Sequence, residues 1–166
     1  MDLDALFQQH AQRVYAFLAY RTGDRMLAED LLGDVFERAI RAQRRYDPRR
    51  GTEEAWLYAI ALNLLRDRAR RAAAERRAFD RLDPAPGAAP FDADGLARRD
   101  ELLAAMATLS AHEREAVALR FGADLTVAQI AEATGERITT IEGRLRRGLR
   151  RMREILEPAE AAVSAG

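Results

Sequence analysis

Residues 126–153 carry the pattern that most restricts what this chain can fold into. A short segment with apolar Ile130 leads to Gly135, and an arginine-rich segment begins near Thr139. A short helix, a turn marked by glycine and an arginine-rich helix are typical of a helix-turn-helix, whose second helix lies in the major groove of DNA. The pattern therefore predicts a helical fold that can read duplex DNA.

The composition argues against several other classes of protein. All 27 basic residues among the 166 are arginines, whose forked guanidinium suits phosphate and guanine edges better than an ammonium group does. Cysteine is absent, and His10 and His112 lack metal-ligand spacing, so we expect no metal or other cofactor. The sequence contains neither a nucleophile–base pair nor a glycine-rich phosphate loop, so we expect no enzymatic activity. No apolar run approaches the roughly 18 residues of a membrane span and no signal peptide is visible, which predicts a cytoplasmic protein.

The formal net charge is zero, yet the charges are unevenly distributed. Residues 63–81 hold seven arginines against three acids, and residues 137–153 hold seven against one. Acidic residues gather elsewhere, on a segment near Glu29 and in the middle of the chain. Because screening limits the reach of exposed charges to about 10 Å, local charge decides phosphate binding. Two basic faces and an acidic face predict two kinds of partner.

Helical periodicity and helix-breaking residues divide the chain into domains. Apolar spacing predicts three helices within residues 1–78, with breaks at Gly23 and at the turn-forming residues 46–51. Residues 79–98 contain three prolines and two glycines, which predicts a flexible acidic linker.

Helices are predicted again over residues 99–157, and residues 158–166 are expected to form a disordered tail. Capping boxes, in which a Ser or Thr side chain and a Glu or Gln three residues later satisfy each other's backbone amides, mark the expected helix starts. The candidate pairs are Ser110–Glu113, Thr126–Gln129 and Thr139–Glu142.

Three segments, in this order, resemble the bacterial sigma-70 family, and specifically its extracytoplasmic-function (ECF) branch. Residues 28–39 look like the family's helix that docks on the polymerase clamp. Residues 55–68 look like its strand-opening helix, and residues 125–153 look like its reader of the minus-thirty-five element. The resemblance covers residues 3–156. It implies an all-α fold, with a region 2-like bundle of three or four helices and a region 4-like helix-turn-helix joined by a flexible linker.

The resemblance implies a transcription initiation factor with no catalysis of its own. The first domain would bind the clamp of core RNA polymerase and help to melt the minus-ten element, and the second would dock on the flap and read the minus-thirty-five element. An anti-sigma factor is implied as a further partner. Acidic residues facing basic clamp helices would steer assembly more than they add affinity. The residues implied for polymerase binding are Glu29, Asp30, Asp34, Glu37 and Arg38.

The family's minus-ten pocket corresponds to the loop 46–54 and the helix that follows it. Asn63 is a poor residue for a helix interior, so we expect it to face something polar. The family places an Asn there beside flipped-out bases, whose extrusion is offset by stacking and hydrogen bonds in a pocket. Trp56 suits the core as well as it suits stacking, and Ala59 stands where the family often has a basic residue. The residues implied for the minus-ten element are Tyr46, Arg49, Arg50, Trp56, Asn63, Arg66 and Arg70.

In the predicted recognition helix, Arg144 is placed to fork onto a guanine, worth about 1–3 kcal/mol of discrimination. Arg147 and Arg151 are expected on phosphates. Glu142 and Gly143 depart from the family, which often has Lys and Ser there, and they leave the promoter sequence open. The residues implied for the minus-thirty-five element are Arg137, Thr140, Arg144, Arg147 and Arg151.

Two alternative functions stay open. A sigma-like mimic would sequester an anti-sigma factor without binding DNA, and the zero net charge and Glu142 favour it. A stand-alone helix-turn-helix regulator would use only residues 102–156 and bind duplex DNA tightly without polymerase. That second alternative leaves residues 1–77 without a role.

Overall fold

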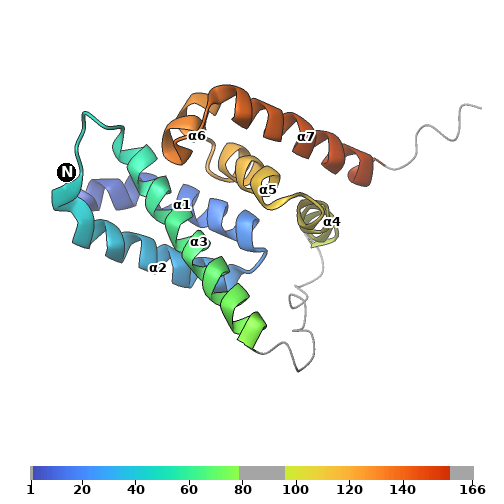
Figure 1. The fold of residues 1–166 in the computed structure, drawn as a ribbon, viewed down its shortest axis with the longest axis horizontal. Helices are drawn as coiled ribbons and strands as arrows, with labels where there is room; N and C mark the ends of the chain where they lie inside the picture. The colour runs from blue at the N-terminus through green and yellow to red at the C-terminus, as the bar shows by residue number, and fades with distance from the viewer. Residues whose placement is uncertain (1, 79–95, 158–166) are drawn as a thin grey trace, which may run out of the picture.

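The computed structural model describes residues 2–78 and 96–157. Every regular element in these two ranges is helical (Figure 1). The elements are α1 (Leu3–Thr22), α2 (Arg25–Ala42), the short 3₁₀ turn η1 (Gln43–Arg45), α3 (Glu53–Ala78), α4 (Leu96–Ala107), α5 (Ala111–Val117), the π-helical turn η2 (Ala118–Gly122), α6 (Val127–Thr134) and α7 (Ile138–Leu156). The prediction of an all-α fold with a helix-turn-helix is confirmed.

Helices α1, α2 and α3 form the first bundle. Asp2 and Asp24 accept hydrogen bonds from the first-turn amides of α1 and α2, and Gly23, with a φ of 70°, ends α1 in the left-handed conformation that glycine adopts readily. Thr52 Oγ1 accepts from the Ala55 amide at 3.1 Å and begins α3. The interior contains Phe17, whose ring meets that of Tyr58 edge-on at a centroid distance of 5.8 Å. This bundle is the scaffold on which the loop between η1 and α3 is fixed.

Helices α4 to α7, with η2, form the second bundle. The capping boxes of Ser110 with Glu113 and of Thr126 with Gln129 are both present, as predicted. The predicted third box is wrong: α7 begins one residue before Thr139, its N-cap is Arg137, and no side chain caps it. Gly135 ends α6 with a φ of 72°, which provides the sharp turn of the helix-turn-helix.

The two bundles pack directly against each other. Helix α1 contacts η2, and the beginning of α3 lies beside α6 (Figure 1). The buried residues of both bundles form one continuous apolar core. Helix α4 begins at Leu96, inside the segment 79–98 that was predicted as a linker. The rest of that segment, residues 79–95, and the predicted tail 158–166 lie outside the described residues.

Candidate polymerase and nucleic-acid interfaces

The acidic side chains predicted to bind polymerase lie on the outer face of α2. Glu29, Asp30, Asp34 and Glu37 are all exposed, and Glu37 forms an ion pair with Arg41 one turn further along the helix. Ion pairs of this spacing are weak at an exposed site, so the pair leaves Glu37 accessible. The acidic face is therefore available to a basic partner surface.

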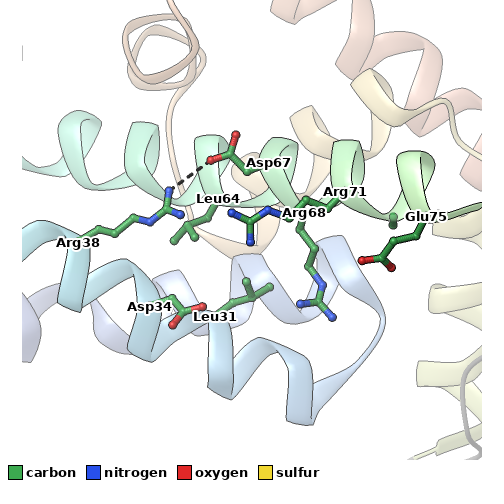
Figure 2. A pocket seen from close by; sticks show the side chains of 9 residues that line it. Leu31, Asp34, Arg38, Leu64, Asp67, Arg68, Arg71 and Glu75 are labelled. Atoms are coloured by element: carbon green, nitrogen blue, oxygen red, sulfur yellow. Dashed lines mark hydrogen bonds and ion pairs between the residues drawn. The ribbon is translucent and has the colours of Figure 1, made fainter. Parts of the chain in front are cut away.

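Arg38, predicted as part of the same face, is instead turned toward α3. Its Nη1 lies 3.4 Å from Asp67 Oδ2, across the groove between the two helices (Figure 2). Asp67 also accepts a hydrogen bond from Arg70. The pKa of the Asp67 carboxyl lies below its ordinary value, mainly because of the hydrogen bond from Arg70 and to a smaller extent because of the one from Arg38. Arg38 and Arg70 thus share one carboxylate that joins α2 to α3.

The groove between α2 and α3 has a volume of about 330 Å³. Leu31 and Leu64 form part of its lining, and Arg68 and Arg71 extend over it from α3 (Figure 2). Neither of these two arginines forms an ion pair with another residue in the part of the chain that the structure describes. The groove is continuous with the acidic face, because Asp34 also lines it.

A second hollow, of about 310 Å³, opens beside the loop that precedes α3. Tyr46 and Trp56 lie on its wall with ring centroids 5.5 Å apart, and the Tyr46 hydroxyl donates to the Gly51 carbonyl at 3.0 Å. Arg50 lines the hollow as well, whereas Arg49 is exposed outside it. Desolvation and the charges of nearby carboxylates raise the pKa of Tyr46 above its ordinary value. Two aromatic rings beside an arginine suit an unstacked base.

Trp56 is neither fully buried nor fully exposed: it packs against the core on one side and lines the hollow on the other. Asn63 is exposed on α3, as its poor helix propensity led us to expect. Arg66 lies on the same helix, and its Nη2 donates to Glu115 Oε1 of the second bundle at 3.2 Å. The structure therefore leaves Asn63 accessible but gives Arg66 an intramolecular partner.

The recognition helix α7 presents Arg137 and Thr140 to solvent but not Arg144. The side chain of Arg144 is only 12% exposed, and both of its terminal nitrogens bind the Glu136 carboxylate, with Nη2 2.7 Å from Oε1. The hydrogen bond from Arg144 lowers the pKa of Glu136. A contact between Arg144 and a guanine requires this pair to open first.

Arg147 and Arg151, predicted to take phosphates, flank a single buried carboxylate. Glu113 is 4% exposed, with Arg147 Nε at 3.5 Å from Oε1 and Arg151 Nη1 at 3.3 Å from Oε2. Burial alone would raise the pKa of Glu113, but hydrogen bonds from Ser110 and the charges of Arg151 and Arg147 lower it. Both arginines remain about half exposed, so they can bind Glu113 and still reach a phosphate.

The sequence interpretation missed the carboxylates that position these arginines. The capping box at Ser110 identified Glu113, but nothing in the spacing showed that two arginines of α7 would bind it. Glu136 lies eight residues before Arg144, and no sequence pattern indicated that the two side chains would form an ion pair. The outward face of α7 also includes Glu142 and Arg146, both exposed. These two side chains are thus accessible to solvent, as Arg137 and Thr140 are.

In the two described ranges, no helix combines the length and the apolar character needed to cross a lipid bilayer.

An arginine-rich recognition helix, joined to a bundle with an acidic helix and an aromatic hollow, defines a DNA-binding protein that also has a protein partner. The family model for sigma-70 region 2 matches residues 6–75, and the model for sigma-70 region 4 matches residues 99–152. The chain belongs to the sigma-70 family.

Curated relatives place it in the ECF branch of that family. The RNA polymerase sigma factor CarQ of Myxococcus xanthus is 38% identical over 96% of this chain and 91% of its own length. The ECF RNA polymerase sigma factor SigE of Mycolicibacterium smegmatis is 36% identical over 98% of this chain, which spans 65% of that relative. Nearly the whole chain is therefore shared with sigma factors.

Solved structures agree with this fold. The sigma factor RpoE of Bartonella quintana, in complex with the anti-sigma factor NepR, superposes with a TM-score of 0.78 over 93% of this chain and 96% of that chain, at 24% identity. CnrH, in complex with the cytosolic domain of CnrY, superposes with a TM-score of 0.69 over 94% of this chain and 88% of that chain, at 23% identity.

Proposed function

We propose that this protein directs core RNA polymerase to promoters by binding the clamp with the acidic face of α2 and the minus-ten element with the hollow beside α3. The observation that carries the proposal is the hollow itself, in which Tyr46 and Trp56 lie beside Arg50 at the start of the helix that carries exposed Asn63. Base stacking on aromatic rings contributes about 1–3 kcal/mol per base and offsets the cost of unstacking.

Recognition of the minus-thirty-five element is assigned to α7. Its exposed N-terminal residues Arg137, Thr140 and Glu142 face the base edges, and Arg147 and Arg151 bind phosphates. Docking of the second bundle on the polymerase flap completes the assembly. The protein works in the cytoplasm as a non-catalytic subunit, with polymerase supplying all the chemistry, and an anti-sigma factor is its inhibitor, as in the complex of RpoE with NepR.

Run-off transcription tests this function directly. Purified chain and core polymerase are given a pool of genomic fragments from the bacterium that carries the gene, and the 5′ ends of the transcripts are sequenced. We expect products that start downstream of one shared pair of sequence elements. Asn63→Ala should reduce these products, whereas Asn63→Asp tests whether the amide donor is needed.

A sigma-like mimic is the second candidate, because Arg144, Arg147 and Arg151 all have carboxylate partners within the chain. A mimic would bind an anti-sigma factor but yield no promoter-dependent product with core polymerase. A stand-alone regulator would instead bind duplex DNA tightly without polymerase. The transcription assay and a duplex-binding assay together separate the three functions.

A further inference from the structure

The groove between α2 and α3 has no role in the function proposed above, although it continues the acidic face of α2 (Figure 2). Its floor is apolar, because Leu31 and Leu64 are both buried in the core of the first bundle. The groove volume of about 330 Å³ lies at the small end of ligand pockets, and an α-helix, with a diameter of about 10 Å, does not fit into it. The groove therefore has room for single side chains of a partner that lies across α2 and α3.

Helix α3 separates its arginines into two sets on different faces. At about 100° per residue, Arg66 and Arg70 lie within about 60° of Asn63 around the helix axis. Arg68 and Arg71 lie about 80–140° from Asn63 in the opposite sense, and they extend over the groove (Figure 2). This second set is therefore turned toward α2 rather than toward the face that Asn63 presents to the minus-ten element.

The groove carries charges of both signs. Its charged lining residues are Asp34, Asp67, Glu75, Arg38, Arg68 and Arg71. In the described ranges, only Arg38 and Asp67 form an ion pair with each other across the groove. Asp34 on the α2 side, and Arg68 and Arg71 on the α3 side, have no ion-pair partner within those ranges. The two walls therefore offer unpaired charges of opposite sign, and a partner can pair with both walls only if it carries both signs itself.

This distribution of charge favours a protein partner over a nucleic acid. A phosphate strand that is attracted by the two arginines is repelled by Asp34 and by the acidic face beside it. A purely basic surface has the opposite mismatch, because it meets Arg68 and Arg71. A helix that carries a carboxylate beside its basic side chains matches both walls. Hydrogen bonds between a guanidinium and a carboxylate are also among the strongest that proteins form.

We propose that Arg68 and Arg71 extend the polymerase-binding face from α2 onto α3, where they bind a carboxylate of the same polymerase surface whose basic side chains meet the acidic face of α2. The inference rests on the proposed function, since it adds a second set of contacts to the clamp-binding site. The methylene groups of that acidic side chain lie on Leu31 and Leu64. A basic surface without the carboxylate leaves the two arginines unpaired, so the groove discriminates the clamp from other basic partners.

Arg68→Ala combined with Arg71→Ala tests this contact in the absence of DNA. The measurement is the dissociation constant of the fluorescently labelled chain for core RNA polymerase of the bacterium that carries the gene. We expect binding to weaken by about tenfold or more, because hydrogen bonds to charged groups are lost. Arg76→Ala combined with Arg77→Ala is the matched control, since these two exposed arginines lie on the same helix but do not line the groove. The control should leave the dissociation constant unchanged.

Charge reversal distinguishes a carboxylate contact from a loss of packing. Arg68→Glu combined with Arg71→Glu should weaken core binding further than the alanine pair does. Because both arginines are exposed, each variant should fold, which circular dichroism and urea denaturation check. Equal binding by the alanine pair and the glutamate pair would show that no carboxylate faces the two arginines, and it would overturn the inference.

Substitutions in the polymerase identify the partner carboxylate. Each acidic residue on the docking surface of the clamp is changed to arginine in turn, and binding to the unsubstituted and the charge-reversed chains is compared. We expect one polymerase variant to weaken binding of the unsubstituted chain and to restore binding of the chain that carries Arg68→Glu and Arg71→Glu. If no polymerase variant does both, the carboxylate contact is rejected.

Run-off transcription separates a role in polymerase binding from a contact with DNA. A polymerase concentration high enough to bind every chain should restore the products of the alanine pair to the level of the unsubstituted chain. If the two arginines bind promoter DNA instead, core binding is unchanged and the products stay low at every polymerase concentration, which overturns the inference.

The same measurements separate this inference from the proposed function. If the unsubstituted chain has no affinity for core polymerase, or gives no promoter-dependent product with it, the proposed function fails. If the unsubstituted chain binds and initiates, but the alanine pair binds core polymerase as tightly, only the extension of the face onto α3 fails.

Discussion

The two bundles prepare their DNA-binding side chains in different ways. In the first bundle the pocket residues are placed by neutral contacts, because Trp56 of α3 packs on the apolar core and Tyr46, in the loop before α3, lies against Trp56 and donates to the Gly51 carbonyl. In the second bundle the arginines of α7 are placed by carboxylates, Glu136 for one and Glu113 for two. Packing fixes a neutral aromatic ring at little electrostatic cost. A carboxylate that orients an arginine, by contrast, competes with DNA phosphates for binding to that arginine. We therefore expect the first bundle to be most sensitive to truncation of buried side chains, and the second bundle to be most sensitive to removal of charged side chains.

Phe17→Ala is expected to have the largest effect. Phe17 is fully buried, packs edge-on against Tyr58 and lies at the contact with Gly122. Its truncation should cost roughly 3–5 kcal/mol of the free energy of unfolding, measured by urea denaturation. Phe7→Ala is the control, because Phe7 is 49% exposed, and it should cost far less. Equal losses would show that packing does not hold the first bundle together.

Arg144→Ala tests the carboxylate-oriented bundle. Removal of one partner from this largely buried pair should cost about 1–3 kcal/mol of stability, because Glu136 loses its donors. If Arg144 reads a base, the same change relaxes preference at one minus-thirty-five position; if Arg144 only orients α7, binding weakens evenly. Arg147→Ala should weaken binding evenly in either case and lower the salt slope by about 1. Binding to a randomised duplex pool distinguishes the outcomes.

The same pair predicts a dependence on pH. Arg144 lowers the pKa of Glu136 in the folded state below the ordinary glutamate value of 4.5, so the pair stabilises the fold above that pH. This stability should be lost as the pH falls through the lowered pKa. Thermal unfolding of Arg144→Ala should therefore approach that of the unsubstituted chain at the acid end, and a constant gap between them from pH 7 to pH 3 would contradict the assignment.

Sequence reasoning located the elements better than it located their partners. Capping boxes, a glycine turn and apolar spacing are local signals, so the starts of α5 and α6 and the end of α6 were predictable from residues such as Ser110, Thr126 and Gly135. The arginine pairs are not local: Arg66 meets Glu115, 49 residues away, and Arg151 meets Glu113, 38 residues away. Whether an arginine is free for DNA therefore depends on how the helices pack, both within the second bundle and between the two bundles. The spacing within its own helix cannot reveal it.

Trp56→Ala is expected to affect binding more than folding. The residue is half-buried, so its loss should destabilise the protein less than Phe17→Ala does. Loss of a stacking surface should weaken binding to a minus-ten single strand by about 1–3 kcal/mol, measured with polymerase present. Trp56→Phe keeps a ring at the site and should restore most of the affinity. If Trp56→Ala lowers the free energy of unfolding more than it weakens DNA binding, Trp56 serves only as a core residue.

Gly143→Ala should have the smallest effect and the opposite sign. Glycine in a helix interior costs roughly 1 kcal/mol relative to alanine, and Gly143 lies well inside α7. An added Cβ would meet Arg147 Nη1 at 3.2 Å, the flexible end of a half-exposed side chain that can shift toward Glu113. We therefore expect a gain of about 0.5–1 kcal/mol in the free energy of unfolding, measured by urea denaturation. A loss instead would show that Arg147 is fixed over Gly143 by its carboxylate, so that even an exposed arginine of the second bundle lacks the freedom that DNA binding requires.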